Sequence, residues 1–147
     1  MNILTDCIRA DAEYSQLLGA VRENFRSKAL PILANGLCEG ASDAFCVALL
    51  EDASAFSPHC ALIICPEEKE CLHTVELLER FGHRAAFFPA RDLSFYDITA
   101  SHEYEHERLL VLSGLVSGTY EAVVTTPDAA LGYTIPPERL RDAMFTV

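Results

Sequence analysis

The chain has 147 residues, half of them hydrophobic, and this length and composition predict one folded domain with a sizeable core. Its formal net charge of −11 at pH 7 argues against a free-standing nucleic-acid-binding protein, because neutralising phosphates requires clustered Lys and Arg side chains. No apolar run is long enough to cross a membrane and the first residues carry several charges, so we expect a cytoplasmic protein without a membrane partner.

The N-terminal part of the chain predicts helices followed by a strand–turn–helix unit. Residues 6–18 and 20–29 show helical patterns, with a break near Gly19. The short apolar run at residues 31–34 predicts a buried parallel strand, and residues 41–52 predict the helix that follows it. The turn between this strand and this helix is where a phosphate-binding loop stands in nucleotide-binding proteins.

That loop requires the pattern G-x-x-x-x-G-K-[ST], in which amides hold phosphate, the Lys supplies charge and the hydroxyl binds magnesium. Counting from Gly36, the second glycine position holds Ala41, although Gly40 lies beside it. The Lys position holds Ser42 and the hydroxyl position holds Asp43. Because the turn lacks a cation and carries carboxylates, we expect it to repel phosphate. It is either a vestigial nucleotide site or an ordinary strand-to-helix turn.

The rest of the chain alternates strands with helices. Strands are expected at residues 60–65, 85–88 and 122–125, helices at 67–81 and 102–117, and helical turns at 127–131 and 137–144. This alternation indicates βαβ units, so we predict an α/β fold in which a parallel sheet is flanked by helices. Four residues of the 102–117 helix are expected to face inward: Leu109, Leu112, Leu115 and Val116.

The chain contains six cysteines, which we expect to be reduced. Cys46, Cys60 and Cys65 lie in apolar runs, where cysteine is usually a small buried residue. No C-x-x-C spacing occurs, so the sequence gives little support for zinc binding by Cys60, Cys65, Cys71 and His73.

The segment from His102 to His106 reads HEYEH and matches the H-E-x-x-H motif of zinc hydrolases. On a helix, the two histidines would share one face and Glu103 would activate a zinc-bound water. The same segment also suits an ordinary helix start, because the carboxylates of Glu103, Glu105 and Glu107 favour the positive end of the helix. A small zinc-dependent hydrolase is therefore the alternative function.

A series of short motifs follows from residue 88 onward. Phe88-Pro89 ends a predicted strand, Tyr96-Asp97 closes a short loop, and the next helix carries Glu107-Arg108. Further on, the chain reads VVTTP, then AL, then IPP, all before residue 140. In order and spacing, these motifs resemble the N-terminal, UvrB-like module of the transcription-repair coupling factors, the Mfd family. The resemblance covers roughly residues 30–147.

The resemblance implies a RecA-like, P-loop-like lobe at residues 30–147 with a degenerate nucleotide site, preceded by an N-terminal helical extension at residues 1–29. The apolar last residues suggest that the lobe is truncated. The full protein would use ATP and magnesium in downstream motor domains to release stalled RNA polymerase from DNA. It would recruit UvrA for nucleotide excision repair through the neighbouring domain. This lobe itself would be a non-catalytic scaffold without a cofactor, in contact with other domains of the same protein.

The resemblance also implies structural roles for the motif residues. Phe88 and Pro89 would end a core strand. Tyr96 and Asp97 would fix the loop onto the following helix. Arg108 would pair with a carboxylate in that region, or it would be a solvated residue of the helix surface.

Overall fold

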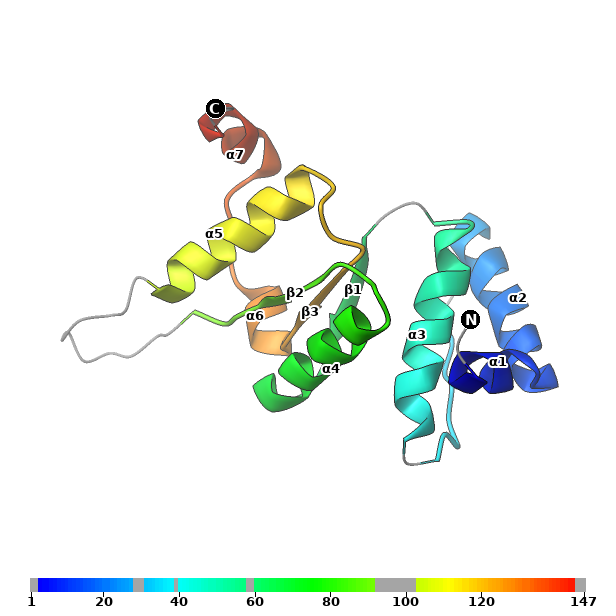
Figure 1. Cartoon of the computed structure of the whole chain (residues 1–147). Helices are drawn as coiled ribbons and strands as arrows, with labels where there is room; N and C mark the ends of the chain where they lie inside the picture. The colour runs from blue at the N-terminus through cyan, green and yellow to red at the C-terminus, as the bar shows by residue number, and fades with distance from the viewer. Residues whose placement is uncertain (1–2, 28–30, 39, 58–59, 92–102, 145–147) are drawn as a thin grey trace. The chain divides into compact units, whose positions relative to one another are not determined.

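The computed structural model describes residues 3–27, 31–38, 40–57, 60–91 and 103–144 (Figure 1). Contacts divide the chain into two compact units, an N-terminal unit of residues 1–59 and a C-terminal unit of residues 60–147. This division does not fall at residue 30, because residues 31–57 group with the N-terminal helices.

The N-terminal unit is helical in its described part, with α1 at Ile3–Arg9, α2 at Ala12–Ser27 and α3 at Ala41–Ser54. The first break lies near Asp11, and α2 continues through Gly19, where the sequence pattern predicts an interruption. The reason is local, because the Asp11 carboxylate accepts a hydrogen bond from the amide of Glu13 at 2.8 Å. A side-chain oxygen placed in this way satisfies a free amide at a helix start, so α2 begins here.

An ion-pair network joins the three helices of this unit. Arg9 of α1 donates from Nη2 to Glu51 at 2.6 Å and to Asp52 at 2.8 Å, both on α3. Tyr14 of α2 donates its hydroxyl hydrogen to the other oxygen of Asp52 at 2.7 Å. The Tyr14 ring also meets Phe45 edge to face, with ring centroids 5.9 Å apart. Asp52 thus accepts hydrogen bonds from both other helices of the unit.

The strand predicted at residues 31–34 is wrong. Residues 31–38 form neither helix nor strand, and all of them are exposed. A strand needs a neighbour to satisfy its backbone groups, and the described part of the N-terminal unit contains no sheet that this segment could join. The run therefore links α2 to α3 as irregular chain.

The C-terminal unit contains a three-stranded parallel sheet flanked by helices, in the strand order β1-β3-β2. Its elements, in chain order, are β1 at Ala61–Ile64, α4 at Glu68–Arg80, β2 at Ala85–Phe88, α5 at Glu103–Val116, β3 at Ala122–Thr125, α6 at Pro127–Leu131 and α7 at Pro137–Ala143. The strands predicted at residues 85–88 and 122–125 are confirmed to the residue. The α/β class is confirmed as a mixed fold with this small parallel sheet.

The central strand β3 is buried along its whole length. Ala122 stands level with Ala61 of β1 on one side and with Ala85 of β2 on the other. Thr125 at the end of β3 donates its hydroxyl hydrogen to the carbonyl of Phe88 at 2.8 Å, which pairs a buried polar group. The central position explains why this strand reads as a continuous run of small and β-branched residues.

Helix α4 packs against β2 and β3 and ends at Arg80, one residue before its predicted end, with Gly82 in the turn that follows. Gly82 adopts a φ of +88°, the left-handed conformation that glycine accepts without strain. The amide of His83 then bonds to the carbonyl of Leu78 at 3.0 Å, which closes the helix end. On the packed face of α4, Cys71 and Leu78 are fully buried.

The prediction for the inward face of α5 is wrong for Leu109 and Leu115, whereas Leu112 and Val116 are half-buried and Leu112 packs against the core. Leu109 is 45% exposed and Leu115 is 36% exposed, whereas Arg108 and Val111 are buried. The apolar pattern was ambiguous because leucines and valine occur on several sides of this helix. A charged residue, Arg108, occupies the buried face in their place.

One edge of the sheet remains apolar and exposed. Strand β1 alternates half-buried and exposed residues, and Leu62 and Ile64 are 62% and 53% exposed. In the part of the chain that the structure describes, β1 pairs with β3 alone, so its other side is an edge of the described sheet.

Replacing Leu78 with Ala should lower the free energy of unfolding by about 2–5 kcal/mol, because it removes a fully buried side chain and leaves a cavity. Denaturant titration followed by far-ultraviolet circular dichroism measures the change. Leu72→Ala on the same helix is the matched control, since Leu72 is 50% exposed and its truncation should cost far less. Equal losses for the two variants would contradict this packing of α4.

Replacing Asp52 with Asn should reduce the acid sensitivity of the N-terminal unit. Burial alone would raise the pKa of Asp52, but the hydrogen bonds from Arg9 and Tyr14 outweigh burial and lower it. A lowered pKa in the folded state gives stability that is present above the ordinary value of about 3.9 and is lost as the pH falls below it.

We expect Asp52→Asn to cost about 1–2 kcal/mol at pH 7, and its stability should then fall less than that of the wild type as the pH is lowered from 5 to about 2. Unfolding titrations across this pH range provide the measurement. Glu23→Gln is the control, because it removes one charge from an exposed position of α2. A wild-type pH profile in Asp52→Asn would show that the network contributes nothing.

Candidate functional site

The residues of the predicted phosphate-loop remnant lie in the N-terminal unit, around the start of α3. Gly36 and Gly40 have φ values of +80° and +84°, so both use the conformational freedom of glycine. Ala41 begins α3, Ser42 is exposed and Asp43 is half-buried. No strand precedes this turn in the described residues, so the strand–turn–helix setting of a phosphate loop is not present there. A vestigial nucleotide site remains a prediction.

The possible zinc motif lies at the start of α5. This helix begins at Glu103, and His106 in its first turns is exposed. His102 and the Glu103 side chain lie outside the described residues, so their geometry is not tested. Within the parts of the chain that the structure describes, no three His, Cys, Asp or Glu side chains are grouped closely enough to hold a metal ion.

The cysteines differ from the prediction in one respect. Cys60 is exposed, because it lies just outside β1, whereas Cys46 and Cys65 are half-buried. The Cys65 sulfur lies 3.7 Å from the Thr74 hydroxyl of α4. Burial, with a further contribution from neighbouring Cys65, raises the pKa of the buried Cys71 thiol to about 11. Cys71 is therefore a thiol in the core at neutral pH, with little thiolate character.

Three of the motif residues meet in the C-terminal unit. Arg108 of α5 donates from Nη1 to the carbonyl of Pro89, and its guanidinium carbon lies 4.1 Å from the centroid of the Phe88 ring. Only 4% of Arg108 is exposed. The interpretation of Arg108 as a solvated surface residue is therefore wrong, because the end of β2 covers it.

The remaining motif residues are Tyr96, Asp97 and Glu107. Tyr96 and Asp97 lie outside the described residues, so their predicted role in fixing the loop onto α5 stays a prediction, as does the pairing of Arg108 with a carboxylate of that loop. Glu107 precedes Arg108 but is exposed, since it projects from another side of α5.

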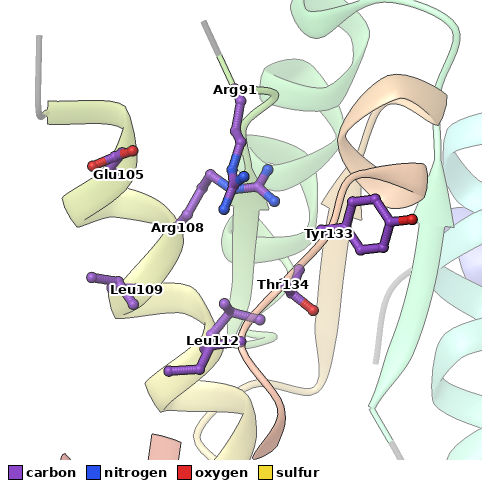
Figure 2. A pocket seen from close by; sticks show the side chains of 8 residues that line it. Arg91, Glu105, Arg108, Leu109, Leu112, Tyr133 and Thr134 are labelled. Atoms are coloured by element: carbon purple, nitrogen blue, oxygen red, sulfur yellow. The ribbon is translucent and has the colours of Figure 1, made fainter. Parts of the chain in front are cut away.

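A pocket of about 190 Å³ lies beside the Arg108 cluster (Figure 2). Its walls come from the residues after β2, from α5 and from the segment between α6 and α7. The lining residues are Arg91, Glu105, Arg108, Leu109, Leu112, Tyr133, Thr134 and Ile135. The pocket therefore combines two guanidinium groups and one carboxylate with an apolar wall.

Among the described residues, no carboxylate forms an ion pair with Arg108. Burial lowers the pKa of Arg108, and the nearby charge of Arg91 lowers it further. The Nη2 atom of Arg108 is buried and has no hydrogen-bond partner among the described residues. A guanidinium normally pairs all of its N–H groups when it is buried, so this atom is an unmet donor.

Sequence reasoning missed Arg91 and Tyr133 as members of a site. A usable signal existed for Arg91, because it follows the carboxyl end of β2, and ligands in parallel α/β sheets tend to bind at that edge. Tyr133 carried no such signal, since it lies in an irregular segment between two short helices.

Comparisons of the chain with known protein families, with known protein sequences and with solved structures find no match. Among the described residues, no helix has both the length and the apolar character needed to cross a membrane.

Proposed function

We propose that this chain is a non-catalytic scaffold module from the N-terminal, UvrB-like region of a transcription-repair coupling factor. The observation that carries the proposal is the cluster of Phe88, Pro89 and Arg108, which joins two separate motifs of the resemblance in one packed contact. Residues used in this way hold β2 against α5 rather than perform chemistry. The parallel sheet flanked by helices is compatible with a RecA-like lobe.

In this proposal, the nucleotide site is degenerate, and the lobe contacts other domains of the same cytoplasmic protein. ATP and magnesium act in the motor domains of the full protein, which would release stalled RNA polymerase from DNA. UvrA would bind through the neighbouring domain. The lack of a cation at Ser42 and the carboxylate of Asp43 support the absence of ATP binding here.

A test of this function is the strand preference of repair in the host organism. Deleting the gene that encodes the full protein should slow the removal of ultraviolet lesions from transcribed strands to the rate of the opposite strand. Repair of the non-transcribed strand in the same cells is the internal control and should not change. An unaltered preference for the transcribed strand would contradict the proposal.

The purified chain tests the alternatives directly. We expect titration with magnesium-ATP to show binding no tighter than the millimolar range, and elemental analysis to show no stoichiometric zinc. Micromolar ATP affinity would argue for an active nucleotide site. Near one zinc per chain, lost in His106→Ala, would instead support a zinc hydrolase that uses His102, Glu103 and His106.

A further inference from the structure

The buried guanidinium of Arg108 poses a physical problem that the described residues do not solve. Among the described residues, Arg108 donates a hydrogen bond to the carbonyl of Pro89 and stacks on Phe88. Neither contact carries a formal negative charge. Removing an ion from water is costly unless an opposite charge or a full set of hydrogen bonds replaces the water. The free Nη2 atom shows that the replacement is incomplete among the described residues.

The pocket beside Arg108 can receive the missing partner. Arg91 lines the same pocket. Burial lowers the pKa of Arg108, and the like charge of Arg91 lowers this pKa further. Figure 2 shows both guanidinium groups directed into this space, between α5 and the segment that carries Tyr133. Two convergent guanidiniums favour an oxyanion, because their planar N–H groups match the oxygen atoms of a carboxylate or phosphate.

The rest of the lining favours one oxyanion over the other. Leu109, Leu112 and Ile135 form an apolar wall that suits the hydrocarbon part of an organic acid. Glu105 adds a carboxylate at the same pocket, which would repel a doubly charged phosphate more than a singly charged carboxylate.

We propose that the pocket between the end of β2, α5 and residues 133–135 binds a carboxylate with an apolar body, held by Arg108 and Arg91. The carboxylate would accept hydrogen bonds from Nη2 of Arg108 and from Arg91, while the apolar body packs against the leucines of α5. The ligand can be a free organic acid or the carboxyl terminus of a peptide. This inference goes beyond the scaffold function and does not depend on it.

The test is a titration of the full chain followed by amide resonances of residues 104–112 and 132–135. The probes are 3-phenylpropionate, its neutral amide, inorganic phosphate, and N-acetyl-Gly-Phe with a free carboxyl group. We expect saturable shifts with 3-phenylpropionate in the millimolar range or tighter, and weaker binding of the amide and of phosphate. A stronger response to N-acetyl-Gly-Phe would identify a peptide terminus as the source of the carboxylate.

Arg91→Met is the main variant, because Arg91 is exposed and its replacement should leave the fold intact. We expect it to weaken binding about tenfold or more, since it removes a charge-assisted hydrogen bond. Arg80→Met is the matched control, because Arg80 is an exposed arginine of α4 that pairs with Glu76 outside the pocket. It should bind as the wild type does. Arg108→Lys, which keeps a charge but loses the planar fork, should also weaken binding.

Several results would overturn the proposal. These are no saturable binding by the wild type, equal binding of the neutral amide, tighter binding of inorganic phosphate, or unchanged affinity in Arg91→Met. A further such result is binding of 3-phenylpropionate by Asp97→Asn but not by the wild type. It would show that a carboxylate of the chain itself occupies the pocket, and it would overturn the proposal of an external ligand.

Discussion

The burial of β3 is the constraint on which the C-terminal unit depends. Both other strands pair with β3 and not with each other, so the sheet exists only while β3 is in place. Its four residues are small or β-branched, which lets α4 approach the sheet closely. Thr125 adds a side-chain contact to the backbone pairing of the strands, because its hydroxyl donates a hydrogen bond to the carbonyl of Phe88 at the end of β2. Phe88, whose ring contacts Arg108, is thus held at the end of β2 by its backbone.

In the proposed carboxylate site, Arg108 would be a structural residue and a binding residue at once. One edge of its guanidinium is used by the Pro89 carbonyl and one face by the Phe88 ring. The Nη2 atom has no hydrogen-bond partner among the described residues, and Arg108 is one of the residues that line the pocket. Because the first two contacts fix the orientation of the group, the free edge is already positioned for a ligand and little conformational entropy would be lost on binding. A surface arginine would need to be ordered first.

The sequence predicted the C-terminal unit well because its signals agree with one another. Gly82 follows a helix and a short run of apolar residues comes next, and these two signals are enough to predict the strand at residues 85–88. The same reasoning failed at residues 31–34, where a short apolar run looks like a strand but has no partner in its unit. The site was predicted only in part. The apolar periodicity of α5 predicted a buried Leu109. The sequence left open whether Arg108 is buried or solvated, because the contact that buries Arg108 comes from a segment that is distant in sequence.

The apolar edge at β1 has a consequence for how copies of this chain behave toward one another. An edge strand with exposed Leu62 and Ile64 offers both unpaired backbone groups and apolar side chains, which together can add a strand from another molecule. The net charge of −11 opposes this approach through mutual repulsion at neutral pH. As carboxylates become protonated in acid, or as salt screens them, this repulsion fades while the apolar edge stays the same. The acidic composition can thus limit the association of copies of this chain through the exposed edge strand β1.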